Sequence, residues 1–477
     1  MMEYTPLSDF GIRPGILTLW TAVLRPGRDW SSDDRPLTSA HEKYYHSFDS
    51  TDRNPGRGRW IGTIFEMDAP FDAQVVRDLL WVWHARHEGL RTTAVEASDS
   101  PGRLTRSTCA GSDVDIVHER VSDVFTSAEL NDRLNAELES RLSPLRWPHC
   151  LAATIEHRDT GNFTLLVGAD HSVMDAYSQV LIVTELRALY RALLDGAALY
   201  GSDVYGSAAD YALLEREAAA ALTAESPPVA LWREFLDAAD RMFPRFQPSV
   251  PHVDEVGGPP QTSVSRWLLT DAEATAIDAA VTALGYRATT AVFAALALAS
   301  NRLSGAADFR TIMPMATRPD ARWSESVGWF VNIVPVWIPV NGDADLSTAL
   351  AATDTALRRA RSATTAPAQR ILEILEVADE PRFAVSFVDI RRLHDDELIT
   401  ALRGRALRSH SYSSEEVYFW IVRAAKGINI SARFPPACRA IAHRFIEEFT
   451  AILRACGTEI SPTGDAAVLS ATNTGAA

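Results

Sequence analysis

A histidine and an aspartate stand four residues apart in the segment Asp-His-Ser-Val-Met-Asp at positions 170–175. Imidazole has an unperturbed pKa of about 6.5, so His171 could take a proton from a hydroxyl or an amine near neutral pH without much tuning. Asp175 could hold the loop that carries His171, or it could serve only as the N-cap of the next helix. On residue types and spacing alone, the segment is a candidate for general-base chemistry.

The flanking sequence predicts that this segment joins a strand to a helix. Residues 163–168, Phe-Thr-Leu-Leu-Val-Gly, form a short apolar run that is typical of a buried strand. After the segment, apolar residues recur at helical spacing until Asp195-Gly196 stops the run: Val180, Val183, Leu186, Tyr190 and Leu193. His171 is therefore expected where a strand ends and a helix is about to begin.

The composition is that of an ordinary globular protein. The chain has 477 residues, of which 47% are apolar and 23% charged, and it is longer than one hydrophobic core usually supports, so we expect two domains. Acidic residues outnumber basic ones by 62 to 46, which gives a formal charge of −16, and there is no basic run. Such a chain would repel a phosphate backbone, so no nucleic-acid partner is expected.

Neither export nor a stable membrane insertion is expected. Residues 1–15 lack the basic and apolar regions of a signal peptide. The longest near-continuous apolar stretch, residues 288–299, is shorter than the roughly 18–20 residues that cross a bilayer. We therefore predict a cytoplasmic protein.

The cysteines give no sign of a metal or disulfide framework. Cys109, Cys150, Cys438 and Cys456 form no CxxC pair and do not stand at metal-ligand spacing from a histidine. Cys150 follows His149, but adjacent side chains of a strand point to opposite faces. We expect four reduced, structural thiols and no metal site.

The chain is predicted to divide at residues 223–229, where Pro227-Pro228 is expected to end the helical stretch 211–222. The predicted parts are an N-terminal lobe, residues 1–225, which carries the histidine motif, a C-terminal lobe, residues 226–460, and a flexible tail, residues 461–477. Each lobe would begin with a strand and an amphipathic helix: residues 60–65 and 72–87 in the first, 264–269 and 271–284 in the second. This like order suggests a pseudo-twofold arrangement with a cleft between the lobes.

The second half is predicted to be rich in strands. Residues 383–389 form one strand, and residues 417–422 and 428–434 form a hairpin around the turn 423–427. Residues 331–340 are mainly apolar, but Pro335 and Pro339 cannot donate to a ladder, which places the run at a sheet edge or at a crossover between the lobes. Residues 252–261 are expected to form a long surface loop.

Several separated segments resemble those of one family, in the right order along almost the whole chain. Residues 170–176 resemble the HHxxxDG motif that defines the condensation-domain superfamily of CoA-dependent acyltransferases. Pro36–His41 resembles the opening motif of that superfamily, Arg86–Thr92 its RHxxLRT motif and Ser326–Asn332 its GxFxN segment. Asp9–Gly15 with Trp20 resembles the opening of the polyketide-associated, Pap-type acyltransferases, and Val385–Asp389 resembles their acceptor-side strand. Together these patterns are far more specific than the histidine motif alone.

The resemblance implies an α/β (α+β) fold of two chloramphenicol-acetyltransferase-like lobes in a pseudo-twofold V, with mixed sheets, flanking helices and the active site in the cleft. It implies that His171 is the general base and that Asp175 is structural, paired with an arginine. Arg318, in Ala-Thr-Arg-Pro, is the best match for that partner, with an exposed turn residue before Pro319 as the alternative. A buried Asp–Arg pair would fix the loop, because breaking it strands a charge.

Two positions depart from the family motif. Asp170 replaces the first histidine, which is not the proton acceptor in that family, so Asp170 is expected either to orient the loop or to raise the basicity of His171. Ala176 replaces the final glycine, which is harmless if its φ is negative and costly if φ is positive.

The implied activity is direct transfer of an acyl group from acyl-CoA or a phosphopantetheine-carried thioester to a hydroxyl of a sugar or polyketide-type acceptor, in natural-product or glycolipid biosynthesis. The thioester is a co-substrate, and no permanently bound cofactor is expected. No acyl-enzyme is required, and the chain has neither a GxSxG elbow nor a cysteine placed as a nucleophile. The alternatives are a free-standing condensation enzyme that forms an amide and a catalytically inactive, condensation-like recruitment domain.

The expected partners are a small-molecule acceptor and acyl-CoA or an acyl carrier protein. A monomer would suffice, since two lobes of one chain can form the cleft. Five residues are candidates for the substrate channels: Trp329, Asn332, Ser386, Tyr418 and Trp420. Core packing is the alternative for the aromatic residues. Asn332 lies in a buried run, so it needs a hydrogen-bond partner, in the structure or in a substrate.

Overall fold

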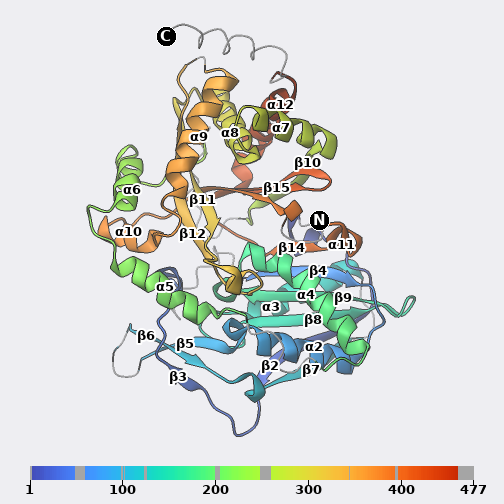
Figure 1. Cartoon of the computed structure of the whole chain (residues 1–477). Helices are drawn as coiled ribbons and strands as arrows, with labels where there is room; N and C mark the ends of the chain where they lie inside the picture. Colours follow the sequence, from blue (N-terminus) through green and yellow to red (C-terminus); the bar gives the residue numbers. More distant parts are fainter. Residues whose placement is uncertain are drawn as a thin grey trace, which may run out of the picture.

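The computed structural model describes residues 3–48, 60–97, 100, 102–122, 126–198, 205–247, 259–342, 344–392 and 396–459. Two lobes lie one above the other, each built on a mixed sheet with helices on its faces (Figure 1). The predicted α/β fold with mixed sheets is therefore confirmed. The predicted tail, residues 461–477, and residues 252–258 of the predicted loop lie outside the described residues.

A seven-stranded sheet carries the first lobe, and a strand from the second half of the chain completes it. That strand, β14, pairs antiparallel with β4 and parallel with β1. Across the sheet the order is β1 (Tyr4–Pro6), β14 (Arg405–Arg408), β4 (Trp60–Met67), β9 (Phe163–Asp170), β8 (Cys150–Glu156), β2 (Ile16–Leu24) and β7 (Val114–Ser122). The crossing between the two halves is thus made by β14.

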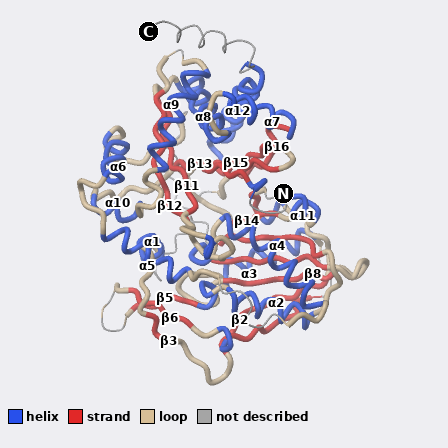
Figure 2. Tube along the Cα trace, viewed as in Figure 1, coloured by secondary structure: helices blue, strands red, loops and turns tan. Residues whose placement is uncertain are grey.

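Helices cover both faces of this sheet (Figure 2). The helices α2 (Ala73–Arg86) and α4 (Ala176–Leu194) pack in one buried cluster and α3 (Ser127–Arg141) in another. The predicted first helix is confirmed as α2, and Asp72 caps it by accepting hydrogen bonds from the backbone N–H groups of residues 74 and 75. The strand β9 is buried along its whole length, as its apolar run predicts.

A six-stranded sheet carries the second lobe. Its order is β10 (Thr262–Thr270), β16 (Gly427–Phe434), β15 (Val417–Ala424), β13 (Phe383–Asp389), β11 (Asp308–Ala316) and β12 (Val331–Pro339). The predicted hairpin is confirmed, because β15 and β16 pair antiparallel across their short turn. The proline-containing run is β12, which lies at the edge of the sheet, one of its two predicted places.

The helices of the second lobe also pack in two groups. One group shares a buried cluster with one face of the sheet: α7 (Asp271–Ala283), α8 (Ala288–Ser304), α9 (Leu346–Arg361) and α12 (Arg439–Glu459). The helices α6 (Pro227–Asp237) and α10 (Ala368–Ile374) pack with Ile312 of β11 in a second cluster. The prediction that Pro227-Pro228 ends a helix is wrong: α5 (Ala208–Ala220) ends earlier, and the prolines begin α6, where a missing N–H costs nothing.

The lobes share part of one core. Val422 and Ala424 of β15 belong to the same buried cluster as Ile61 of β4 and Ala169 of β9. Three small elements lie around this junction or at its edge, α1 (Ser39–His46), α11 (Asp396–Ala401) and a three-stranded sheet of β3 (Ser31–Asp33), β6 (Leu104–Thr108) and β5 (Thr92–Glu96). Where the two sheets approach each other, side chains from distant parts of the sequence can converge.

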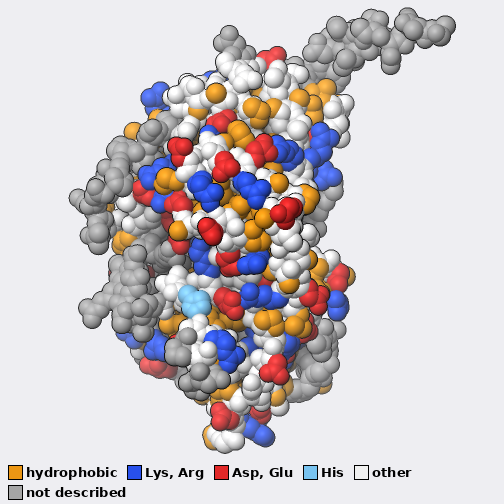
Figure 3. Space-filling view, turned by 90° about the vertical axis from the view of Figure 1, so that its left-hand side faces the viewer, with side chains coloured by type: hydrophobic (Ala, Val, Ile, Leu, Met, Phe, Trp, Pro, Cys, Tyr) orange, Lys and Arg blue, Asp and Glu red, His pale blue; other side chains and the backbone are white. Residues whose placement is uncertain are grey.

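The visible surface carries charges of both signs, as the composition predicts (Figure 3). Acidic and basic side chains are interspersed over the face shown in Figure 3. Among the described helices, none alone combines the length and apolarity of a membrane span, and only α7 and α8 meet those criteria as a pair, which is bent by 100°. The four cysteines are buried and free, as predicted.

Separating the lobes should destabilise the first one, because β14 then leaves and exposes the edge of β4. We expect residues 1–225 expressed alone to be poorly soluble, and co-expression with residues 226–477 to restore a soluble complex. The measurement is the soluble yield and the urea midpoint of the purified material. A soluble, monomeric 1–225 fragment as stable as the whole chain would show that β14 is dispensable.

Candidate active site

His171 lies where the sequence places it, in the single 3-10 turn 171–173 between β9 and α4. Asp170, the last residue of β9, is fully buried. Its carboxylate accepts hydrogen bonds from the backbone N–H of Ser172, at 2.9 Å, and from the hydroxyl of Tyr44, at 3.2 Å. These contacts orient the loop, one of the two roles predicted for Asp170.

His41 holds the same turn from the other side. Its Nε2 donates to the carbonyl oxygen of Ser172 at 2.8 Å, and its Nδ1 accepts from the hydroxyl of Thr38 at 3.0 Å. Burial, and then the charge of Arg106, lower the pKa of His41 to about 3. The ring therefore stays neutral, as both hydrogen bonds require.

Asp175 anchors the far end of the turn and is also fully buried. It caps α4 by accepting from the backbone N–H of Ser178 at 2.7 Å, and it forms an ion pair of 2.9 Å with Arg318. Burial acts to raise the pKa of Asp175, but Arg318 and Ser178 hold it below its ordinary value. The two readings of Asp175 in the sequence, helix cap and arginine partner, are both correct.

Arg318 lies in the segment between β11 and β12, which reaches from the second lobe to the first. Besides two contacts with Asp175, it donates to the backbone carbonyls of Trp323 and Ser326, each at 3.1 Å. Its side chain is only 8% exposed, which excludes the alternative of an exposed turn residue. Because the partners come from different lobes, the pair fixes both the turn and the approach of one lobe to the other.

His171 as a residue is partly exposed, while its Nδ1 is buried. Within the described part of the chain, Nδ1 has no hydrogen-bond partner in another residue. Burial, and then the charge of Arg408, lower the pKa of His171 to about 4. At neutral pH the ring is therefore uncharged and able to accept a proton.

Ala176 is the first residue of α4 and is not one of the positions with positive φ. Alanine therefore fits there without strain. The departure from the glycine of the motif has no conformational cost.

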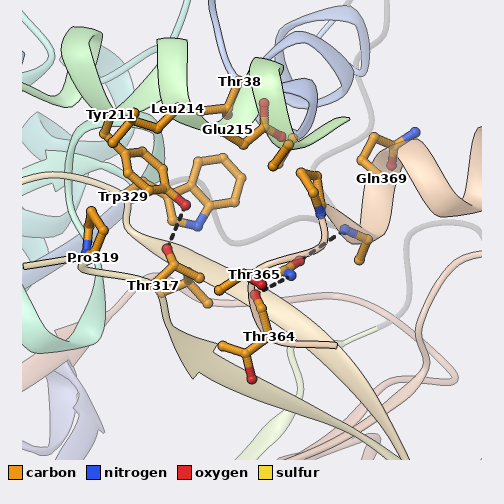
Figure 4. A pocket seen from close by; sticks show the side chains of 16 residues that line it. Thr38, Tyr211, Leu214, Glu215, Thr317, Pro319, Trp329, Thr364, Thr365 and Gln369 are labelled. Carbon is orange, nitrogen blue, oxygen red and sulfur yellow. Dashed lines mark hydrogen bonds between the residues drawn. The ribbon is translucent and has the colours of Figure 1, made fainter. Parts of the chain in front are cut away.

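Trp329 separates His171 from two hollows. Its ring centre lies 5.1 Å from that of His171, and it also contacts the rings of His41 and Tyr44. A cavity of about 760 Å³, here named the α5 cavity, opens on one side of Trp329. Figure 4 shows side chains of α5 on one side of this cavity and of the segment that leads into α10 on the other: Tyr211, Leu214 and Glu215, facing Thr364, Thr365 and Gln369.

A second hollow, here named the Tyr44 hollow, has about 860 Å³ and shares Ala40, Trp329 and Gln369 with the α5 cavity. Tyr418 lines it, whereas Trp420, stacked on Tyr418 at 5.6 Å, lines a smaller hollow beside β1. Three of the predicted channel residues thus line hollows in the structure.

Asn332 and Ser386, the other two predicted channel residues, differ from these three in their contacts. Asn332 borders the α5 cavity, but its amide donates to the carbonyls of Thr364 and Ala366 and accepts from the N–H of Ala368. Its side-chain hydrogen bonds are thus made to the backbone. Ser386 pairs in register with Trp420 and lies on the same face of the sheet. It does not line the hollows described above.

Comparison with known proteins places the chain in a family. A family model described as Condensation domain matches residues 59–397, well over half of the chain. The chain belongs to the condensation-domain family. Its fold agrees: the structure named PapA2 acyl transferase matches with a TM-score of 0.83 at 21% identity, over 96% of this chain and 100% of the other.

Relatives of this condensation-domain protein include named acyltransferases. Acyltransferase PapA3 of Mycobacterium tuberculosis is 25% identical over 328 residues, 67% of this chain and 68% of the relative. Trehalose-2-sulfate acyltransferase PapA2 of Mycobacterium bovis is 25% identical over 355 residues, 71% of each chain. The first condensation domain of the calcium-dependent antibiotic synthetase has the same fold, with a TM-score of 0.68 at 17% identity, over 89% of this chain and 98% of the other.

Residues that the sequence reasoning missed complete the condensation-domain site. His41 ends the segment 36–41, which had been recognised as a motif, so its type and position were a usable signal. Tyr44 lies three residues further along the same helix and thus could have been inferred from it. Nothing in the sequence indicates that Arg408 belongs to the site, because β14 reaches His171 only through the pairing of strands far apart in the sequence.

Replacing Arg318 with methionine should lower the free energy of unfolding by about 3–5 kcal/mol, because it leaves the buried carboxylate of Asp175 without its charge partner. The measurement is urea unfolding followed by circular dichroism. The matched control is Arg322→Met in the same segment, whose arginine is 70% exposed in its pair with Asp320, so this replacement should change the free energy of unfolding far less. Equal losses in the two variants would contradict the anchoring role.

Acid should destabilise this condensation domain before its carboxylates titrate. The pKa of His41 is lowered to about 3, and those of His84, His149 and His171 to about 4. In the unfolded chain these groups bind protons near pH 6.5, so the unfolded state takes up more protons than the folded one between about pH 6.5 and 4. The urea midpoint should fall steadily as the pH is lowered through that window. A constant midpoint from pH 6.5 to 4.5 would contradict the burial of these neutral rings.

Proposed function

We propose that the protein is an acyltransferase that moves an acyl group from a thioester, carried by CoA or by a carrier protein, to a hydroxyl of a sugar or polyketide-type acceptor. The observation that carries the proposal is the position of His171, a partly exposed residue with an uncharged imidazole, on a turn anchored at both ends. The relatives named as acyltransferases, two of them acting on trehalose derivatives by name, support the reaction type and the sugar acceptor.

His171 supplies the general base in this proposal. The acceptor O–H gives its proton to Nε2 as the oxygen attacks the thioester carbonyl, a C–O bond forms, and the C–S bond breaks. The thiolate leaves and receives the proton, so the imidazole is neutral again after each turnover. Because Nδ1 is buried, the proposal assigns the substrate to the Nε2 edge of the ring.

The two hollows meet at Trp329, whose ring contacts that of His171, and this position supports them as separate approaches for the two substrates. An acceptor and a thioester must reach the same imidazole from different directions if the attack is to be direct. Of the residues that the α5 cavity and the Tyr44 hollow share, Trp329 contacts His171, with 5.1 Å between the ring centres. We propose that each substrate uses one of them, in a cytoplasmic protein that acts as a monomer.

His171→Ala should abolish transfer, with a loss of at least about 10²–10⁴ in kcat, because general-base catalysis typically contributes that much. Mass spectrometry of the product, with a panel of acyl-CoA donors against sugar and amine acceptors, measures the rate and also tells an ester from an amide. His118→Ala, an exposed histidine on β7, is the control and should keep full activity.

Circular dichroism must first show that His171→Ala is folded. Unchanged product formation by that folded variant would remove His171 from the chemistry. The absence of transfer by the unmodified protein with every donor and acceptor pair would instead favour the recruitment domain.

A further inference from the structure

Two arginines lie together at the small hollow beside β1. Arg408 comes from β14 of the first sheet and Arg433 from β16 of the second, and both line this hollow with Tyr4 and Trp420. They are close enough for the charge of Arg433 to lower the pKa of Arg408. In a chain with a net charge of −16, this is a local concentration of positive charge.

Neither guanidinium has a hydrogen-bond partner within the described residues, and the Nε atoms of both are buried. Arg408 forms no ion pair there, and Arg433 has only Glu416, at 3.9 Å. The main cause that lowers the pKa of Arg408, to about 10, is burial. Removing a charge from water without a partner is costly, so buried charges are normally paired. Glu416 lies beside Arg433 alone, so within the described residues the charge of Arg408 has no carboxylate partner.

Aromatic rings hold the guanidinium of Arg408 in place. Its central carbon lies 4.3 Å from the ring centre of Trp420 and 4.9 Å from that of Tyr4. Contact with a ring face offsets part of the desolvation cost. It leaves the N–H groups at the edge of the guanidinium without acceptors, in the planar fork that matches a carboxylate, sulfate or phosphate.

Strand register places this fork near His171. Arg408 pairs with Ile61 of β4, and Ile61 pairs with Ala169 of β9, so the three residues form one row across the sheet. Neighbouring strands lie about 4.8 Å apart, which puts the backbone of Arg408 about 10 Å from the end of β9. The side chain is long enough to shorten that separation, and its charge is the second cause of the low pKa of His171.

We propose that Arg408 and Arg433 form a subsite for an anionic group, a carboxylate, sulfate or phosphate, on the acceptor whose hydroxyl His171 deprotonates. The neutral rings of Tyr4 and Trp420 hold the fork, and the ligand supplies the acceptor atoms that it lacks. The assignment of the ligand as the acceptor depends on the proposed acyl transfer, whereas the capacity to bind an anion does not depend on it.

The donor does not fit this subsite. The phosphates of CoA, or of a carrier's prosthetic group, lie at the far end of the pantetheine arm, away from the thioester that reacts beside His171. An anion on Arg408 sits close to the reacting atoms, and thus belongs to the molecule that presents the hydroxyl or to the acyl group itself.

Anion binding is tested with inorganic sulfate on the full chain, by isothermal titration calorimetry at constant ionic strength with chloride as the balancing ion. Arg408→Met should weaken sulfate binding at least tenfold. The matched control is Arg405→Met on the same strand, whose charge faces Glu3 at 3.8 Å and which should bind as the unmodified protein does. Arg408→Lys, which keeps the charge but not the fork, should give an intermediate loss.

A second readout separates a ligand site from a structural pair. Bound sulfate should raise the pKa of His171, measured by NMR of histidine ring carbons, because it offsets the charge that lowers that pKa. Arg408→Met should raise it as well and should remove the effect of sulfate. If sulfate neither binds the unmodified protein nor moves this pKa, the subsite does not exist.

The source of the anion is tested with two acceptors that differ only in the charged group, trehalose and trehalose 2-sulfate, with one acyl-CoA donor. The sulfated acceptor should have the higher kcat/KM by at least tenfold, and Arg408→Met should erase that preference. Equal rates with both, or an unchanged preference in the variant, would overturn the assignment to the acceptor. If neither sugar reacts with any donor while sulfate binding still depends on Arg408, the proposed transfer fails and the anion site stands.

Discussion

The buried ion pair between Asp175 and Arg318 is the constraint on which the site depends. One partner comes from the turn after β9 and the other from the segment after β11, so the pair ties the two lobes together at the position of the candidate base. The pair contributes more to the geometry of the site than to net stability. Its attraction roughly offsets the cost of desolvating both groups, whereas removing one member leaves a buried, unpaired charge. The arrangement of the lobes and the aim of His171 are therefore fixed by the same contact.

The surroundings of His171 balance two needs of a base. Burial and the charge of Arg408 keep the imidazole neutral, which makes it available at neutral pH, but they also make it a weaker proton acceptor. A substrate that brings negative charge to Arg408 would raise the pKa of His171 and make the imidazole a better proton acceptor, while the imidazole still stays neutral at neutral pH. Recognition of the acceptor and activation of the base would then be coupled through one guanidinium.

Much of the local structure was predictable, because it depends on residues close together in the sequence. The apolar run of β9, the cap at Asp72 and the hairpin of β15 and β16 carry their own signals, and the family motif located His171 and Asp175. What could not be predicted depends on distant pairing. The place of β14 in the first sheet, the capture of Asn332 by three backbone groups and the meeting of Arg408 with Arg433 arise only once the chain has folded. The prolines at 227 and 228 were misread because a helix start and a helix stop use the same residue.

The return of β14 to the first sheet also bears on how the protein is made. A ribosome that has delivered the first half has supplied every strand of that sheet except β14, and the short β1 has no partner strand until β14 arrives. The N-terminal lobe must wait, with one flank open, until residues 405–408 emerge far downstream. The wall that carries Arg408 thus closes only after β14 has emerged, and a nascent chain shorter than that has an incomplete candidate active site.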